Sequence, residues 1–151
     1  MIKDLISLEN CVILDSVKDW KEAVHVSVDL LVKAGACTEE YEDAVIKVTE
    51  EYGPYYVLTD HMALIHASGN DDIVHKTMLS CALLKEPVAF SEEKNDVRVL
   101  IGLCAADSTA HMTGMVAISS IFGDSDNEQK FLEATSAEEI YNLFISHADA
   151  Q

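Results

Sequence analysis

The sequence predicts a three-layer α/β/α sandwich with a mixed central sheet, folded as a single domain. Two amphipathic, helix-like segments come early in the chain. A cluster of short apolar segments rich in Val, Ile, Leu and Tyr fills the middle third, and further helix-like segments follow it. Helices placed before and after a strand cluster are typical of a sheet that is covered on both faces.

The two early helices are predicted by their apolar spacing and by the residues at their ends. From Asp19 to Gly35 the apolar residues recur at helical intervals, with Asp19 near the start and Gly35 as the C-terminal cap. The next segment repeats this design. Thr38 is its expected N-cap, acidic residues fill its first turn, and Gly53 ends it.

The strand cluster is recognised by short runs in which several consecutive positions are apolar. Strands of that kind tend to be covered on both faces. One short strand is predicted before the first helix, and the cluster follows the second helix. The predicted strands cover residues 11–14, 55–59, 62–66, 77–84, 88–90 and 97–106.

Three more helices are expected after the cluster, and residues that favour helix ends mark two of them. Asp107 or Ser108 is the expected N-cap of the first, and Gly123 stops it. Ser136 followed by Glu139 has the spacing of a capping box. The three helices are predicted over residues 107–123, 126–134 and 136–148.

Length and charge restrict the class of protein. The chain has 151 residues, which suits one domain with a real core, and it contains no internal repeat or linker. Its net charge of −17 would repel nucleic acid and anionic membranes. No apolar run approaches the roughly 20 residues that span a bilayer. The first residues do not resemble a signal peptide, so a cytoplasmic location is expected.

The cysteines and the loop motifs point away from metal, thiol and nucleotide chemistry. Cys11, Cys37, Cys81 and Cys104 form no CxxC pair, and three of them lie in apolar, strand-like runs. We therefore expect buried, reduced thiols and no zinc site. The chain has no GxGxxG, Walker or GxSxG motif, so we expect no cofactor.

Two of the six histidines occupy positions that favour chemistry. His66 ends the apolar run 62–66 and precedes a polar loop, while His111 falls in the first turn of the helix after strand 97–106. Both lie just beyond the carboxyl ends of predicted buried strands, the edge at which open α/β sheets bind ligands. If these strands are parallel neighbours, the two imidazoles meet there beside a helix N-terminus.

This arrangement suits a histidine that becomes phosphorylated. A neutral imidazole is a good nucleophile near pH 7 because its ordinary pKa is about 6.5. Phosphoryl transfer requires positioning and stabilisation of spread negative charge. His111 and the backbone N–H groups of the helix could supply that stabilisation around a phosphate on His66.

Two other interpretations of His66 remain open from the residues alone. It could be a core histidine with a satisfied hydrogen bond. It could also bind a metal in an enzyme, with His61 and with Asp60 or Asp107 as further ligands. Positions five apart on a continuous strand point to opposite faces, so the metal site would need a turn at Asp60–His61.

Two longer stretches resemble a known family. GPYYVLTDHMALIHA resembles a segment of the enzyme IIA domains of the mannitol/fructose class in the phosphoenolpyruvate-dependent sugar phosphotransferase system. The phosphorylated histidine of that family falls on His66. LIGLCAADSTAHMTGMVAISSIFGD resembles the family's strand, loop and helix with a second active-site histidine, which falls on His111. The resemblance covers about residues 7–144 of the single domain 1–151 and is greatest to the ascorbate-type branch.

The resemblance implies a cytoplasmic phosphocarrier with a phosphohistidine intermediate. It would accept phosphate on His66 from the histidine phosphocarrier protein and pass it to a cysteine of a cognate enzyme IIB. Enzyme IIB serves a membrane permease, enzyme IIC, here for L-ascorbate or a related sugar acid or pentitol. An alternative within the same fold is a regulatory binding module that is controlled by phosphorylation of His66.

The sequence departs from the family pattern near the active strand. Asp60–His61 stands where the family has Pro-Gly, and Ile65 stands where it has Pro. Ser68 occupies a position at which ascorbate-type members often have Arg.

The phosphate must therefore be stabilised without a nearby arginine. Arg98 is the only arginine, and its place near the start of a strand predicts that it lies at the edge far from His66. We expect the phosphate to rely on backbone N–H groups, on His111 and on hydroxyls such as those of Thr59 or Ser68.

Overall fold

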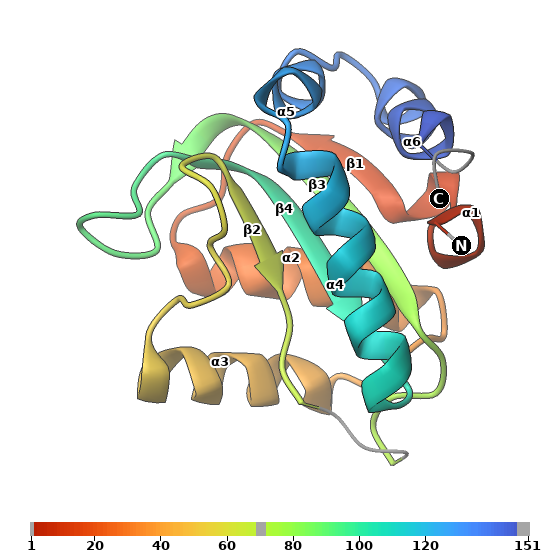
Figure 1. Cartoon of the computed structure of the whole chain (residues 1–151). Helices are drawn as coiled ribbons and strands as arrows, with labels where there is room; N and C mark the ends of the chain where they lie inside the picture. The colour runs from red at the N-terminus through yellow and green to blue at the C-terminus, as the bar shows by residue number, and fades with distance from the viewer. Residues whose placement is uncertain (1, 69–71, 148–151) are drawn as a thin grey trace.

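A computed structural model describes residues 2–68 and 72–147, and in it helices cover both faces of a mixed sheet (Figure 1). The strand order is β1-β3-β4-β2. β1 pairs with β3 in parallel, β2 pairs with β4 in parallel, and β3 pairs with β4 antiparallel. The strands are β1 (Cys11–Leu14), β2 (Met62–Ile65), β3 (Met78–Val88) and β4 (Val97–Cys104).

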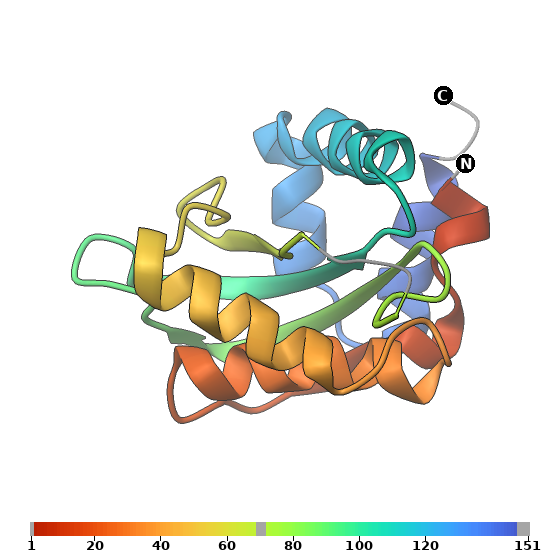
Figure 2. The ribbon, with the colours of Figure 1, turned by 90° about the horizontal axis from the view of Figure 1, so that it is seen from below.

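The helices form the two outer layers (Figure 2). One face of the sheet is covered by α2 (Trp20–Lys33) and α3 (Glu40–Tyr52). The opposite face is covered by α4 (Ser108–Phe122), α5 (Ser125–Leu132), α6 (Ala137–Ser146) and the short α1 (Ile2–Leu5), and the 3-10 helix η1 (Leu8–Asn10) leads into β1. This arrangement confirms the predicted three-layer sandwich. No helix within the described residues is long and apolar enough to cross a membrane.

The sheet separates two apolar cores, and the strands contribute side chains to both. Leu100 of β4 packs in the core beneath α2 and α3, whereas its neighbour Ile101 packs in the core beneath α4–α6. Side chains of a strand alternate between faces, so a strand with helices on both sides is apolar at consecutive positions. That pattern is the one from which the strands were predicted.

Most helix ends follow the predicted side-chain chemistry. The Asp19 carboxylate accepts from the Glu22 backbone N–H at 2.9 Å at the start of α2. The Asp107 carboxylate accepts from Ala110 N–H at 2.8 Å at the start of α4, so Asp107 rather than Ser108 is its N-cap. Gly53 ends α3 with φ of 82°, a left-handed conformation that favours glycine.

The capping box of α6 forms with a shift of one residue. The Ser136 hydroxyl accepts from the Glu139 backbone N–H at 3.1 Å, as predicted. In return the Glu139 carboxylate accepts from the backbone N–H of Thr135 at 3.3 Å, not from that of Ser136. The exchange therefore satisfies a donor that lies just outside the helix.

The prediction that Thr38 caps α3 is wrong. Glu39 holds the N-cap position, with φ and ψ of −60° and −22°, and it makes no side-chain cap. The Thr38 backbone N–H donates to Ile73 O at 2.8 Å, and its hydroxyl is buried without a hydrogen-bond partner. Thr38 is therefore held by its backbone hydrogen bond to Ile73, in the segment before β3, and its side chain does not cap the helix.

Two predicted strands are also wrong. Residues 55–59 do not form a strand: Val57 N–H donates to Pro54 O at 3.2 Å and closes a turn over residues 55–56, and an isolated antiparallel bridge joins Val57 to Ala63. Residues 88–90 are not a separate strand, because β3 runs on to Val88. Pro87 lies where the pairing of β3 with β4 is irregular, a place where a residue without an N–H is tolerated.

Candidate functional site

His66 and His111 meet at the carboxyl ends of two neighbouring parallel strands. The last pair of the β2–β4 ladder is Ile65 with Gly102, and His66 is the next residue of its chain. β4 leads through a short loop into α4, whose first turn holds His111. The two ring centroids are 5.1 Å apart, with an interplanar angle of 64°. The predicted juxtaposition of the two imidazoles is therefore present.

A backbone contact fixes the tautomer of His66. Its Nδ1 atom contacts the carbonyl oxygen of Leu64, and a carbonyl can only accept, so Nδ1 carries the proton. Nε2 is then the nitrogen with the free lone pair, and it makes no hydrogen bond to any residue described in the structure. The imidazole thus has one satisfied nitrogen, as a core histidine would, and one nucleophilic nitrogen.

The surroundings of His66 favour its neutral form. Burial lowers its pKa below the ordinary value of 6.5, because charge is costly where water is excluded. The hydrogen bond to Leu64 acts in the opposite direction, and the neighbouring His111 lowers the pKa again. At pH 7 the lone pair of His66 is therefore available for nucleophilic attack.

A pocket is lined in part by His111, whose ring centroid lies 5.1 Å from that of His66. Its volume is about 300 Å³, and it opens next to the N-terminus of α4. A helix N-terminus presents unpaired N–H groups and a positive dipole to an anion. The residues that line the pocket are Ser68, Ala105, Asp107, Ser108, His111 and Met112.

The hydroxyls predicted for phosphate binding behave differently. Ser68 is exposed and lines the pocket, so its role in phosphate binding stays a prediction. Thr59 precedes β2 and so lies at the opposite end of that strand from His66. Its hydroxyl donates to the carboxylate of Glu128 at 2.7 Å. The expectation that Thr59 contributes to the phosphate site is therefore wrong.

Two tyrosines that sequence reasoning missed hold the backbone around His66. The Tyr55 ring meets the His66 ring edge to face at 5.4 Å, and its hydroxyl donates to the His66 carbonyl at 3.0 Å. The buried Tyr41 hydroxyl contacts the backbone of Ala67, at 2.9 Å from its N–H. Tyr55 stands within the GPY element, which could have indicated it, whereas Tyr41 resembles any apolar residue of a helix.

The alternative metal site is not formed. His61 precedes β2 and His66 follows it, so the two side chains lie at opposite ends of the strand. The His61 Nδ1 atom lies 3.2 Å from a carboxylate oxygen of Asp96. Residues 2–68 and 72–147 contain no group of three His, Cys, Asp or Glu side chains that could hold a metal ion.

Arg98 lies far from His66 and the cysteines are buried, as predicted. The Arg98 guanidinium donates to the carbonyls of Leu84 and Leu132 at the edge of the sheet far from His66. All four cysteines are buried and unpaired. Burial raises the pKa of the Cys11 thiol to about 12, which keeps it protonated and unreactive at neutral pH.

Comparison with known proteins finds relatives that match nearly the whole chain. An ascorbate-specific PTS system EIIA component of Salmonella choleraesuis (strain SC-B67) is 32% identical over 145 residues, covering 94% of each chain. The mannitol-specific cryptic phosphotransferase enzyme IIA of Escherichia coli superposes with a TM-score of 0.87 at 29% identity, over 95% of this chain and 97% of that one.

A second structure from Escherichia coli shares the fold. It is the complex of enzyme IIA and phosphorylated enzyme IIB for mannitol, with a TM-score of 0.79 at 22% identity over 93% of this chain and 97% of that one. The family model described as "Phosphoenolpyruvate-dependent sugar phosphotransferase system, EIIA 2" matches residues 5–147. With two histidines meeting at the expected sheet edge, the chain belongs to the EIIA type 2 family of the sugar phosphotransferase system.

Proposed function

We propose that the protein is a cytoplasmic phosphocarrier, formed as one enzyme IIA domain, that is phosphorylated on Nε2 of His66. The observation that carries the proposal is the contact between Nδ1 of His66 and the Leu64 carbonyl. It holds the proton on Nδ1 and leaves the Nε2 lone pair free beside His111. The buried ring is also pre-oriented, which phosphoryl transfer requires above all.

The phosphoryl group comes from the phosphohistidine of the histidine phosphocarrier protein. The Nε2 lone pair of His66 attacks phosphorus as the phosphorus–nitrogen bond of the donor breaks, and the donor imidazole keeps that electron pair. In the second step a thiolate of enzyme IIB attacks the same phosphorus, and His66 recovers its lone pair. Each step exchanges one bond at phosphorus and needs no cofactor.

The negative charge on the transferred group is stabilised without an arginine. The first N–H groups of α4 and the imidazole of His111 lie at the edge of the sheet where His66 follows the end of β2. The hydroxyls of Ser68 and Ser108 line the adjoining pocket. Positive dipole and several neutral donors can spread the phosphate charge in place of a cationic side chain.

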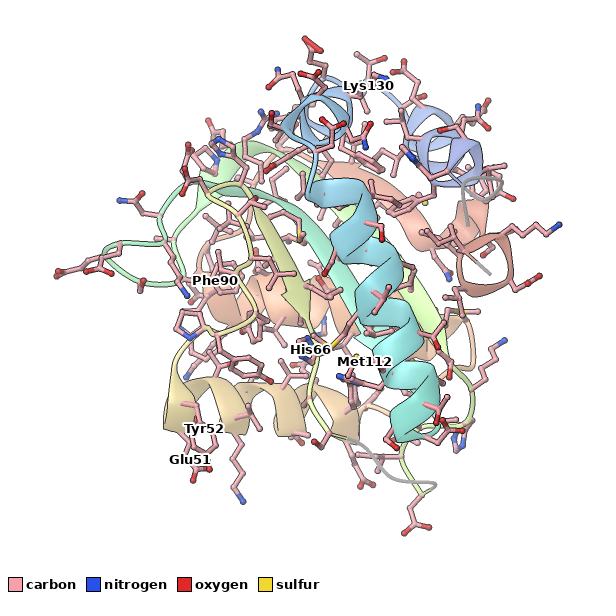
Figure 3. All side chains as sticks on the ribbon, viewed as in Figure 1. Glu51, Tyr52, His66, Phe90, Met112 and Lys130 are labelled. Carbon is pink, nitrogen blue, oxygen red and sulfur yellow. The ribbon has the colours of Figure 1, made fainter. Side chains whose placement is uncertain are left out.

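The surface near the site suits the proposed partners. Met112 and Val116 are 60% and 57% exposed, and they lie one turn apart on α4, the helix that carries His111. Met112 is labelled near His66 in Figure 3. We expect the docking face of the upstream carrier to be apolar with basic residues around it, which would fit these side chains on a protein of net charge −17. Enzyme IIB receives the phosphate, and the permease is served indirectly.

The names of the relatives support the proposed sugar class. The ascorbate-specific relative covers nearly the whole chain, so we propose L-ascorbate, or a related sugar acid or pentitol, as the transported compound. In such a system the IIA domain carries only phosphate and does not bind the sugar.

Phosphorylation by the purified carrier system tests the proposal. With phosphoenolpyruvate, enzyme I and the histidine phosphocarrier protein, the wild type should gain one acid-labile, base-stable phosphate. His66→Ala should abolish the label. His61→Ala is the matched control, because it removes an imidazole at the opposite end of β2 and should label normally. A label that survives in His66→Ala would refute the site, and no label on the wild type would refute the function.

A further inference from the structure

The hydroxyl of Tyr41 joins three backbone groups at the ends of two strands. It accepts from the Ala67 N–H at 2.9 Å. Its proton is directed to the Leu103 carbonyl at 2.7 Å, with the Ala67 carbonyl 3.0 Å away. Tyr41 stands in α3 and is only 1% exposed, so these contacts are formed away from water.

These contacts lie where the β2–β4 ladder stops. Its last pair is Ile65 with Gly102, and beyond it the two chains separate toward His66 and toward α4 (Figure 1). Buried backbone N–H and carbonyl groups require partners. Tyr41 supplies a side-chain hydroxyl where the next ladder bonds would stand, and so connects the two chains one step past the sheet.

The connection joins the two chain segments that carry the histidines. Ala67 is the residue after His66, and Leu103 lies in the strand that leads to His111. The ring centroids of the histidines are 5.1 Å apart, a separation that depends on where the two strand ends lie. A shift of about 1 Å between reacting groups can slow a reaction about a hundredfold.

We propose that Tyr41 is a positioning residue for phosphoryl transfer, whose hydroxyl holds the ends of β2 and β4 at the separation that His66 and His111 require. The inference rests on the proposed phosphocarrier function. Tyr41 touches neither imidazole in a hydrogen bond and exchanges no proton in the reaction. Burial raises its pKa well above the ordinary value, so the hydroxyl keeps its proton throughout the working pH range.

The chain offers a matched control in Tyr56. It is also fully buried, and its ring centroid lies 6.2 Å from that of His66. Its hydroxyl, however, is bonded to the side chain of Thr49 at 2.7 Å, and not to the strand ends. Tyr41→Phe and Tyr56→Phe therefore delete the same atom from the same kind of environment, and only the first releases the connection.

The experiment compares both variants in two assays. In the first, Tyr41→Phe should accept phosphate from the phosphorylated carrier at least about tenfold more slowly than wild type, whereas Tyr56→Phe should stay within about twofold. In the second, nitrogen-15 spectra of the unphosphorylated protein should show altered His66 ring signals in Tyr41→Phe only. Site-specific 3-fluorotyrosine at position 41, which keeps the hydroxyl, should restore both the rate and the spectrum.

Normal transfer by folded Tyr41→Phe, or equal slowing and equal spectral change in Tyr56→Phe, would overturn the inference. If Tyr41→Phe does not fold, hydrogen exchange in the wild type decides. The Ala67 amide should then be strongly protected, and exchange as fast as in an exposed loop would contradict the connection. If no variant and no wild type accepts phosphate, the proposed function fails, while the spectra still test the effect of Tyr41 on His66.

Discussion

The imidazole of His66 meets that of His111 edge to face, with ring centroids 5.1 Å apart. The parallel pairing of β2 with β4 creates this contact, because it brings the carboxyl ends of both strands to one edge of the sheet. Burial disfavours protonation of His66 and so lowers its pKa, and the neighbouring His111 acts in the same direction. The pair is therefore built to keep His66 neutral.

The first prediction concerns the pH dependence of phosphate acceptance. Only neutral His66 has a lone pair on Nε2, and its pKa lies below 6.5. The rate of acceptance should therefore fall to half of its plateau only at a pH below 6.5. Single-turnover rates between pH 5 and 8, with the carrier phosphorylated beforehand, measure this. A decline centred above pH 6.5 would contradict the depressed pKa.

The same shift predicts a change of stability with pH. Between the folded pKa of His66 and about 6.5 the unfolded chain binds more protons than the folded one, so stability rises with pH in that window. Below the folded pKa both states bind the proton, and the stability gained by keeping His66 neutral is lost. Urea unfolding of wild type and His66→Asn at several pH values should show a stability difference that grows in favour of wild type from pH 5 to 7. A constant difference would be the opposing result.

A third prediction assigns His111 to onward transfer. His111→Ala should still accept phosphate at a reduced rate, because the His66 tautomer is fixed by Leu64 and not by His111. Transfer to enzyme IIB should slow more, by about ten- to a hundredfold, since one donor to the departing phosphate is lost. His75→Ala removes an exposed imidazole and is the control. Unchanged onward transfer in His111→Ala would remove that residue from the mechanism.

The sequence predicted the elements that depend on local pattern and missed those that depend on tertiary contacts. Strands buried on both faces are apolar at consecutive positions, which identified β2 and β4, and a buried strand followed by histidine placed His66. Local pattern does not show which strands are neighbours, so the parallel pairing of β2 with β4 entered the prediction only as a condition. Tyr41 could not be identified, because its hydroxyl acts on Ala67 and Leu103, whose proximity the fold alone creates.

The turn before β2 shows the same limit. The apolar residues 55–59 have strand-like composition, yet the turn at Pro54 and Val57 prevents an extended strand. At Asp60–His61, where the family has Pro-Gly, the Thr59 side chain stabilises the turn, and local pattern does not reveal this role. The Thr59 hydroxyl accepts from the backbone N–H groups of His61 at 3.2 Å and Met62 at 3.1 Å, and so closes the turn.

A fourth prediction tests the exposed face of α4. Met112 is 60% exposed, so Met112→Glu should leave stability within about 0.5 kcal/mol of wild type. If this face receives the phosphocarrier, the new charge should raise the KM for the phosphorylated carrier about tenfold with little change in kcat. Leu8→Glu alters another exposed apolar side chain, outside α4, and should leave KM unchanged. Equal KM values for both variants would place docking elsewhere.

The fifth prediction concerns the hydrogen bonds that begin β2. Thr59 donates to Glu128, which is 7% exposed, while it accepts from two backbone N–H groups. Thr59→Val keeps the shape but leaves these groups unpaired, which should cost about 1–3 kcal/mol of unfolding free energy. Thr59→Ser keeps the hydroxyl and should recover most of that loss.

Urea unfolding measures this difference, and Thr113→Val is the control. Its hydroxyl bonds only to the Thr109 carbonyl on an exposed face of α4, so its loss should change stability by less than about 0.5 kcal/mol. Phosphate acceptance by folded Thr59→Val should stay within about twofold of wild type, because the residue lies at the opposite end of β2 from His66. A Thr59→Val protein as stable as wild type would show that the turn does not need its hydroxyl.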